Sequence, residues 1–417
     1  MVFFSEPGLE REELAAALRQ SLDGKTLKKA LILPPDYTRL YSGAGIITAE
    51  YYSMLTAMGC EVDVMPALGT HEPMTRQECE AFFLGVVPFE KLIVHNWRTD
   101  VVKLGEVPAA FVSDVSEGLV NTPIDVEVNK HIMDASYDLI LSVGQVVPHE
   151  VVGMANYSKN IFVGCGGSSM INSSHMLGAF YGLERIMGKD FSPVRRVFDY
   201  AQEHYLSGLP LVYVLTVTTN EGDKTNIHGL FIGDKRELFE QAVTLSQKLN
   251  LNYVDKPLQK VVVYLDEREF KSTWLGNKAV YRTRMAIADG GELIILAPGV
   301  RKFGEDDAND RLIRKYGYVG RKNVLALTEA NDDLKENLSV AAHLIHGSSD
   351  DRFSITYCTQ HLSGDEVRNA NFNYMPYDEA VRRYDPAVLK DGFNTLPDGE
   401  EIYYISNPAL GLWDVKR

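Results

Sequence analysis

The sequence has few cysteines and lacks the local motifs of common hydrolases and nucleotide-binding enzymes. Its four cysteines are scattered along 417 residues without a Cys-x-x-Cys pair, which argues against a disulfide framework and a thiolate zinc site. No Gly-x-Ser-x-Gly nucleophile turn and no Walker loop occur. Any chemistry must therefore come from residues that the fold brings together.

Long hydrophobic runs and an excess of basic residues are also missing. No apolar segment approaches the length of a membrane span, and the N-terminus lacks the pattern of a secretory signal. The formal net charge of -15 would repel phosphate backbones and anionic lipid. We expect a cytoplasmic protein without nucleic acid or membrane partners, and the sequence leaves the oligomeric state open.

What is present is the composition of a folded protein with more than one core. Hydrophobic residues make up 45% and charged residues 24%, and 417 residues exceed what one core usually holds. Short apolar segments alternate with amphipathic ones, which predicts an α/β fold with two domains. Each domain would have a mostly parallel sheet flanked by helices, with the active site in the interdomain crevice. We place the domains at 1–256 and 257–394, and residues 395–417 either complete the first or belong to the second.

The expected elements follow one another in this alternating order. In the first domain we expect helices at 8–22, 45–59 and 234–249, a helix that starts at a Thr75/Glu78 capping box, strands at 28–34, 61–68 and 137–144, and a hairpin within 210–232. In the second we expect strands at 261–266, 292–298 and 323–328 and helices near 277–289 and 309–316. A last strand at 401–406 would join either domain.

Polar clusters follow three of the expected strands in the first domain. They are PPDYTR at 34–39, GTHEPM at 69–74, and a segment that runs from Val147 past Lys159 to His175. Ligands in parallel sheets bind beyond the carboxyl ends of the strands, so these clusters would share one crevice. Taken singly, each residue has a simpler explanation as a turn former, a solvated side chain or a structural histidine. Their coincidence favours a functional site.

Two other features have mainly structural interpretations. The loop at 164–169 (GCGGSS) is either a phosphate contact or a tight turn, since it lacks the complete dinucleotide pattern. His343 and His346 lie three residues apart among apolar neighbours, and no third metal ligand is evident. We interpret both histidines as packing residues.

The three clusters together resemble the lactate racemase family of nickel-pincer enzymes, which interconvert the two configurations of 2-hydroxy acids. The similar motifs are DYTR at 36–39, GTHEPMT at 69–75 and PHEVVGMANYSK at 148–159, followed by His175. The resemblance covers the N-terminal domain well. In the C-terminal domain the resemblance is limited to the general alternation of strands and helices and to a Gly290-Gly291 turn before a strand.

The resemblance implies a role for each matching residue. Lys159 would tether a nickel-pincer nucleotide covalently and His175 would bind the nickel, so that these two residues form the metal site. His71 and His149 would be the acid/base pair, Asp36 would orient His71 by a hydrogen bond, and Arg39 would hold the substrate carboxylate. The complete implied set is Asp36, Thr38, Gly153, Asn156, Lys159 and His175 for the cofactor, and Arg39, Tyr281 and Arg282 for the substrate. Maturation enzymes would have to load the cofactor, and the chain made without them would lack it.

These residue types suit inversion at carbon 2. Removal of a hydride gives a 2-keto acid, provided that a base also accepts the hydroxyl proton, and histidine titrates near neutral pH. The two enantiomers present their hydroxyls in different directions, so one histidine is needed for each. A guanidinium fork can clamp a carboxylate at two points while the rest of the substrate moves.

The sequence also departs from the family pattern. Met154–Ser158 stands where the lactate enzymes carry a Ser-Gly-Gly run, and Met285 stands where a lysine is expected. Either Arg282 or Arg284 replaces that lysine, or both are solvated helix residues. The additional polar side chains suit a longer acid than lactate, such as a gluconate-like sugar acid, and they are Asn156, Tyr157, Asn160 and Arg282.

Three alternatives remain beside the sugar-acid epimerase. One is a racemase of lactate or another short 2-hydroxy acid. Another is a conventional divalent-metal isomerase or hydrolase with His71, His149 and His175 around the ion. The third is a binding protein that recognises a hydroxy acid without catalysis.

Overall fold

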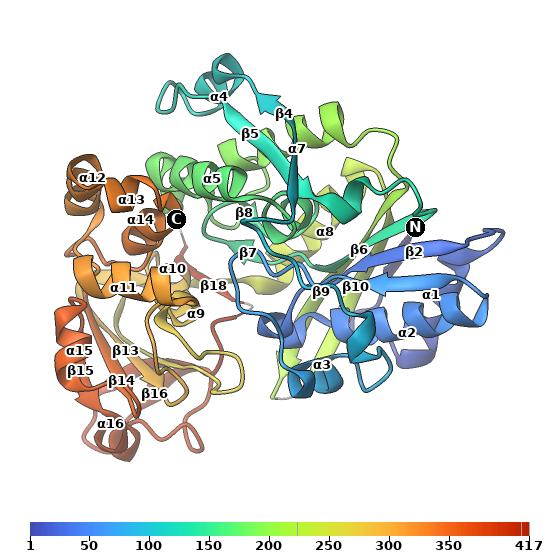
Figure 1. The fold of residues 1–417 in the computed structure, drawn as a ribbon. Coiled ribbons are helices and arrows are strands. Elements are labelled where there is room, and N and C mark those ends of the chain that lie inside the picture. Colours follow the sequence, from blue (N-terminus) through green and yellow to red (C-terminus); the bar gives the residue numbers. More distant parts are fainter. Residues whose placement is uncertain (223, 410, 417) are drawn as a thin grey trace. The chain divides into compact units, whose positions relative to one another are not determined.

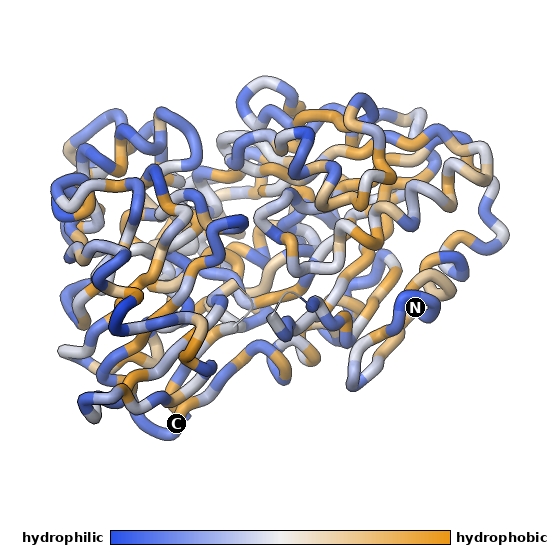
Figure 2. Tube along the Cα trace, turned by 90° about the horizontal axis from the view of Figure 1, so that it is seen from below, coloured by the Kyte–Doolittle hydropathy of each residue, from blue (hydrophilic) through white to orange (hydrophobic). Residues whose placement is uncertain are grey.

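The structure, a computed structural model, describes residues 1–222, 224–409 and 411–416. It divides into two compact units, Met1–Tyr181 with Ile186–Asn250 and Gly182–Arg185 with Leu251–Arg417. In both units helices flank a sheet rich in parallel strands, which confirms the predicted α/β class. Figure 2 shows that hydrophobic and hydrophilic stretches alternate along the chain in both units.

A six-stranded sheet with the order β1-β10-β9-β6-β2-β3 forms the centre of the first unit (Figure 1). The pairs β9-β6, β6-β2 and β2-β3 are parallel, and β10 is antiparallel to both of its neighbours. The β9-β10 hairpin was predicted. The strands are β1 (Val2–Phe4), β2 (Lys29–Leu33), β3 (Glu61–Val64), β6 (Leu139–Gln145), β9 (Leu211–Glu221) and β10 (Lys224–Gly233). Two small antiparallel pairs complete the unit, β4 (Val101–Val107) with β5 (Ile124–Asn129) and β7 (Pro148–His149) with β8 (Gly153–Met154).

Helices cover both faces of this sheet, because alternate strand residues are apolar on each side. Ala30 and Ile32 pack in one core cluster, and Leu31 and Leu33 pack in the other. The first cluster includes α1 (Arg11–Leu22), α2 (Ala44–Ala57) and α3 (Arg76–Phe82), and the second includes α5 (Ser168–Tyr181), α7 (Pro193–Tyr205) and α8 (Arg236–Asn250). Figure 1 shows these two helical layers. The remaining helical segments are α4 (Ala109–Val115), α6 (Leu183–Ile186), the 3₁₀ helices η1 (Tyr37–Ser42), η2 (Phe89–Lys91) and η3 (Lys130–Met133), and the π-helix η4 (Asn160–Gly164).

The strand order reverses beside β2. The chain passes from β2 to β3 on one side and later returns as β6 on the other side of β2. Loops that leave the carboxyl ends of such strands diverge and create a place for a ligand. The three polar clusters of the sequence follow β2, β3 and β6, so all of them begin at this edge of the sheet.

The second unit has its own six-stranded sheet, with the order β15-β14-β13-β12-β17-β16. Only β16 and β17 pair antiparallel in this sheet. The strands are β12 (Leu258–Tyr264), β13 (Ile287–Ala297), β14 (Ser354–Thr359), β15 (Asn373–Pro376), β16 (Gly392–Thr395) and β17 (Glu401–Ile405), and a separate parallel pair joins β11 (Leu251–Val254) to β18 (Leu412–Val415). The strand at 401–406, which the sequence assigned to either domain, therefore pairs within the second unit.

The helices of the second unit are short. They are α9 (Thr273–Gly276), α10 (Lys278–Thr283), α11 (Asp307–Tyr316), α12 (Arg321–Ala330), α13 (Asp332–Lys335), α14 (Leu338–His346), α15 (Gly364–Asn369) and α16 (Tyr377–Arg383). None of the helices within residues 1–222, 224–409 and 411–416 has the length and hydrophobicity that a membrane span requires.

Three predictions for the second unit were wrong. Residues 323–328 form part of α12 rather than a strand, because Val324 and Thr328 are buried at helical spacing and a short apolar run cannot by itself distinguish the two. The helix near 277–289 ends at Thr283, and β13 begins at Ile287. Gly290-Gly291 therefore lies inside a strand, at an irregularity in its pairing with β12, and forms no turn before it.

We expect Gly153→Ala to destabilise the first unit strongly. Gly153 has φ +90°, and a Cβ there would overlap the carbonyl oxygen of Lys189. Backbone strain and overpacking together should cost about 2–5 kcal/mol. Gly118 is the matched control, since it has φ +81° but open space around the Cβ position, and Gly118→Ala should cost only about 1–2 kcal/mol. Urea denaturation of both variants tests this, and equal losses would contradict it.

Candidate active site

Three loops that carry the predicted site residues leave neighbouring parallel strands at one edge of the first sheet. The first continues from β2 through Arg39, the second from β3 through His71, and the third from β6 to Lys159. The sequence predicted this convergence from the positions of the clusters after apolar strands. His175 follows on α5, within the same unit.

Two hydrogen-bonded links hold these loops together. The side-chain amide of Asn160 donates to the carbonyl oxygen of Leu33 at 3.1 Å and to the hydroxyl of Ser142 at 2.9 Å, which anchors the residue after Lys159 to the end of β2 and the middle of β6. The backbone N–H of Gly69 donates to the carbonyl oxygen of Gly164 at 2.8 Å, which joins the second loop to the third.

A buried Asp36 and a partly buried His71 form an acid–imidazole pair. The Nδ1–H of His71 donates to Oδ2 of Asp36 at 2.6 Å, while Oδ1 of Asp36 accepts from the backbone N–H and hydroxyl of Thr38 at 3.0 and 2.5 Å. Burial alone would raise the pKa of Asp36, yet His71, Thr38 and Arg39 together lower it below its usual value. Because the carboxylate holds the proton on Nδ1, the Nε2 lone pair of His71 is available to accept another proton.

His149 has the opposite arrangement of its ring nitrogens. Its Nδ1 accepts a 3.1 Å hydrogen bond from the backbone N–H of Val151, so the neutral ring carries its proton on Nε2. The carboxylate of Glu150 lies 3.6 Å from the same Nδ1. His149 is therefore arranged to donate from Nε2, whereas His71 is arranged to accept there.

Lys159 has an amine with the properties of a nucleophile. Burial and the nearby charge of Arg39 lower the pKa of Lys159 to about 8. Among the described residues, no side chain or carbonyl group forms a hydrogen bond or ion pair with this amine. A partly unprotonated lysine without a partner is suited to form a covalent bond.

His175 is prepared to bind a metal ion through one nitrogen. Its Nδ1–H donates to the carbonyl oxygen of Ile171 at 2.7 Å, which leaves the Nε2 lone pair available. Burial lowers the pKa of His175 to about 4, so the ring is neutral at physiological pH. A neutral imidazole with its second nitrogen oriented by a carbonyl group is the usual form of a metal ligand.

Arg39 is available for an anionic ligand. It lies on η1 with a partly buried side chain, and it forms no ion pair with any carboxylate of the described chain. A guanidinium that is not neutralised by the protein can bind a carboxylate at two points. Asp36, Arg39, His71, His149, Lys159 and His175 thus lie in one compact unit.

Comparison with known families identifies this part of the chain. Residues 9–185 match the family model of the lactate racemase N-terminal domain. The chain carries a lactate racemase N-terminal domain. The family prediction is therefore confirmed for the segment that holds all three polar clusters.

Solved structures share the fold over the whole chain. A protein from Thermotoga maritima is 24% identical with a TM-score of 0.85, over 99% of this chain and 100% of that one. The lactate racemase apoprotein from Thermoanaerobacterium thermosaccharolyticum is 16% identical with a TM-score of 0.68, over 97% of this chain and 93% of that one. No curated protein matches the sequence.

Outside the lactate racemase N-terminal domain, both arginines considered for the substrate are buried. Arg282 donates to the carbonyl oxygen of Gly411 at 2.9 Å, and Arg284 pairs with Glu184 at 2.9 Å and with Asp350 at 3.1 Å. The alternative that they are solvated helix residues was therefore wrong. These contacts give both arginines a structural role in the second unit, and a substrate role for Arg282 or its neighbour Tyr281 stays a prediction.

A buried ion pair in the second unit was not predicted from the sequence. The ammonium of Lys278 lies 3.1 Å from Glu269, and both side chains are less than 5% exposed. A buried charge pair is costly to form and often marks a functional position. A lysine directly before the apolar run AVY at 279–281 was the available signal.

The polar side chains that suggested a sugar acid are engaged within the protein. Asn156 accepts from the backbone N–H of Tyr157 at 2.7 Å, and the hydroxyl of Tyr157 accepts from Gln202 at 2.8 Å. Asn160 links two strands, and Arg282 binds Gly411. These four residues therefore give no support to a long hydroxylated substrate.

Two other features have structural explanations. The backbone N–H of Ser169 at the start of α5 donates to the carboxylate of Glu127 at 3.0 Å, so the loop at 164–169 is a tight turn whose anion position is filled by the protein. His343 stacks on Trp274 at 4.2 Å and hydrogen-bonds to Tyr318 at 2.9 Å, in agreement with a packing role.

A metal site built from side chains alone is not supported. In the described part of the chain, no three His, Cys, Asp or Glu side chains are grouped so that they hold a metal ion. A metal bound by His175 would thus need further ligands from a cofactor. This geometry disfavours a conventional site that joins His71, His149 and His175.

We expect Lys159 to be the most reactive lysine of the chain made without cofactor. With a pKa of about 8, about half of its amine is unprotonated at pH 8, whereas an ordinary lysine is almost fully protonated there. At pH 8 a small acylating reagent should modify Lys159 about tenfold faster than exposed Lys25, as peptide mass spectrometry would show. Labelling of Lys159 at the rate of Lys25 would contradict the perturbed environment.

We expect Asp36→Asn to remove a pH-dependent part of the stability. The native pKa of Asp36 lies below the ordinary value of 3.8, so its contribution is complete above that pH and disappears as the pH falls through the native pKa. Near pH 7 the variant should lose about 2 kcal/mol of unfolding free energy, the scale of a charged hydrogen bond. Urea titrations at neutral pH and below pH 3.8 measure the difference, which should shrink in acid. A difference that is constant across this range would contradict the assignment.

Proposed function

We propose that the protein inverts carbon 2 of a 2-hydroxy acid, as a racemase or epimerase. The observation that supports this best is the opposite proton arrangement of His71 and His149. One ring is arranged to accept a proton and the other to donate one. Inversion requires both, because a proton leaves the hydroxyl of one configuration and another must reach the oxygen of the opposite configuration.

His71 accepts the hydroxyl proton at Nε2. The imidazolium that results is stabilised by Asp36, whose carboxylate is 2.6 Å from Nδ1 and is itself held by Thr38. The same carboxylate keeps the ring from rotating. His149 donates from Nε2, and the N–H of Val151 holds its ring in place.

Arg39 binds the substrate carboxylate. Its charge has no carboxylate partner in the described chain, so it balances the negative substrate within a protein of net charge -15. The carboxylate acts as the fixed point, and the carbon beside it changes configuration.

Lys159 and His175 fit a tethered nickel-pincer nucleotide. The unpartnered amine of Lys159 suits a covalent attachment, and the free Nε2 of His175 suits one metal coordination position, which nickel accepts from imidazole. When bound, such a cofactor supplies reversible hydride acceptance at carbon 2. The chain itself supplies the proton transfers and the carboxylate clamp.

The substrate is proposed at the level of its class. A gluconate-like acid and a short acid such as lactate share the carboxylate and the 2-hydroxyl that these residues address. Chiral analysis of product from lactate, malate and gluconate, each incubated with protein matured in the presence of the cofactor enzymes and nickel, would distinguish them. Inversion of lactate alone would contradict the sugar-acid prediction.

We expect His71→Gln and His149→Gln each to lower the inversion rate of the active acid at least about 100-fold, the scale of lost acid/base catalysis. Substrate binding, measured by calorimetry, should change little because Arg39 remains. His204→Gln is the control, since His204 is exposed on α7 and stacks on Tyr200. If the protein only binds its ligand, the form without substitutions would bind the acid but would not invert it. Absence of a mass adduct on Lys159 after maturation would contradict the cofactor assignment.

A further inference from the structure

The turn before Lys159 has an unusual backbone. Asn156 and Tyr157 are consecutive residues with φ of +64° and +56°. Side chains other than glycine in this left-handed region cost about 1–2 kcal/mol each, so a pair of them persists only where the surroundings hold it. This turn ends two residues before Lys159, and its conformation therefore determines the position of the Lys159 backbone.

Arg195 spans this turn from inside the protein. Its side chain is completely buried on α7. One terminal nitrogen of the guanidinium donates to the carbonyl oxygens of Met154 at 2.7 Å and Asn156 at 3.1 Å, and the other donates to the hydroxyl of Ser158 at 2.7 Å. Three donations from one rigid group fix the positions before, within and after the left-handed pair.

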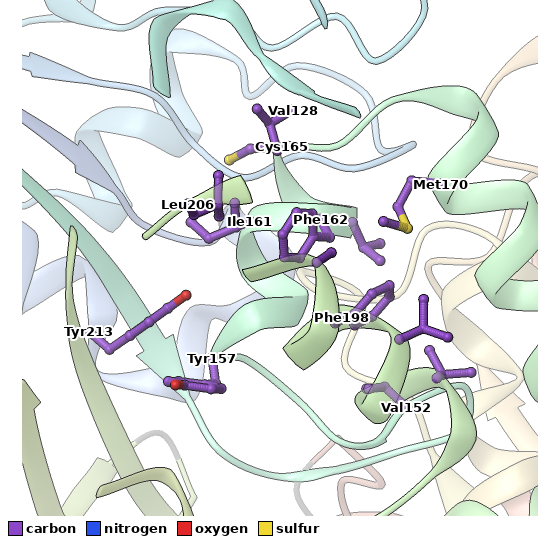
Figure 3. Close-up of a cluster of buried hydrophobic side chains, with 14 of the residues drawn as sticks. Val128, Val152, Tyr157, Ile161, Phe162, Cys165, Met170, Phe198, Leu206 and Tyr213 are labelled. Carbon is purple, nitrogen blue, oxygen red and sulfur yellow. The ribbon is translucent and has the colours of Figure 1, made fainter. Parts of the chain in front are cut away.

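Packing and charge hold Arg195 itself. Its guanidinium lies over the ring of Phe239 at 4.5 Å, and the hydroxyl of Ser158 donates a hydrogen bond to Asp199 at 2.8 Å. The ring of Tyr157 lies 4.3 Å from that of Tyr213 and 5.0 Å from that of Phe239. Figure 3 shows Tyr157 beside Tyr213, and the pair Phe162 and Phe198 in the same apolar cluster. The turn is thus fastened through both its backbone and its side chain.

We propose that Arg195 is a positioning residue, which holds the left-handed turn at Asn156 and Tyr157 and thereby places Lys159 for covalent attachment of the cofactor. The role of Lys159 rests on the proposed function, whereas the role of Arg195 toward the turn rests on its own contacts. Arg195 acts through the backbone and touches no reacting atom.

The test compares Arg195→Lys and Arg195→Met with Arg236→Met. Arg236 is a matched control, because its guanidinium also lies over Phe239, at 4.9 Å, and pairs with Asp199 without contacting the turn's carbonyl groups. Lysine keeps the charge but cannot reach three acceptors at once. Hydrogen exchange of the amides of Ala155 and Asn160, which bond to Val147 and Tyr157, reports the turn in protein without cofactor.

In both Arg195 variants the amides of Ala155 and Asn160 should exchange at least tenfold faster than in Arg236→Met. The amides of α7 and α8 should exchange at the same rate in all three variants. The fraction of chains with an adduct on Lys159 should fall at least fivefold. If Arg195→Met does not fold, Arg195→Lys decides. Exchange that rises equally across α7, α8 and the turn, or no more than in Arg236→Met, would overturn the proposal.

A second comparison separates positioning from general stability. Asn156→Gly removes one strained position, since glycine adopts positive φ freely. In that background Arg195→Lys should raise exchange at Asn160 by about threefold or less, and an undiminished tenfold effect would overturn the proposal. If the protein without substitutions never acquires an adduct on Lys159, the proposed function is contradicted. The hydrogen-exchange data still test the role of Arg195 in that case.

Discussion

The amide of Asn160 anchors the residue after Lys159 to two parallel strands, and the arrangement of the site depends on that connection. It bonds to the carbonyl oxygen of Leu33 at the end of β2 and to Ser142 within β6, beside the point where the strand order reverses. A parallel sheet brings loops from distant parts of the sequence to one edge, but it does not set their distances. Short bonds such as this one and the link from Gly69 to Gly164 do so. The acid/base groups and the lysine thus inherit the rigidity of the sheet.

The two histidines show how one residue type serves two purposes. A carboxylate beside Nδ1 of His71 and a backbone N–H beside Nδ1 of His149 place the ring protons on opposite nitrogens. The partner of His149 is a backbone N–H of its own loop, whereas the partner of His71 is Asp36 in the neighbouring loop after β2. The environment, and not the imidazole, gives each ring its direction of proton transfer.

Much of the first unit was predictable because local patterns and the fold agree there. The apolar run of β2, the capping box at Thr75 and the β9-β10 hairpin follow from periodicity and capping. The Asp36–His71 contact was expected only from the family resemblance. Arg195 was missed, since it lies 36 positions after Lys159 and no sequence motif announces a buried arginine that bonds to carbonyl groups. The assignment of 323–328 to a strand failed because a run of four apolar residues fits either period, and the burial of Val324 and Thr328 at helical spacing belongs to a helix.

The backbone conformation of the turn before Lys159 is held by Arg195, which lies on helix α7. The conformation therefore depends less on which side chains the turn itself carries. Asn156 and Tyr157 show that residues with bulk and polarity are compatible with a left-handed turn once its carbonyl groups are held. Evolution could then diversify this loop while the lysine after it stays in register. Positions 156, 157 and 195 should accordingly covary among homologous chains, with glycine at the first two wherever the arginine is absent.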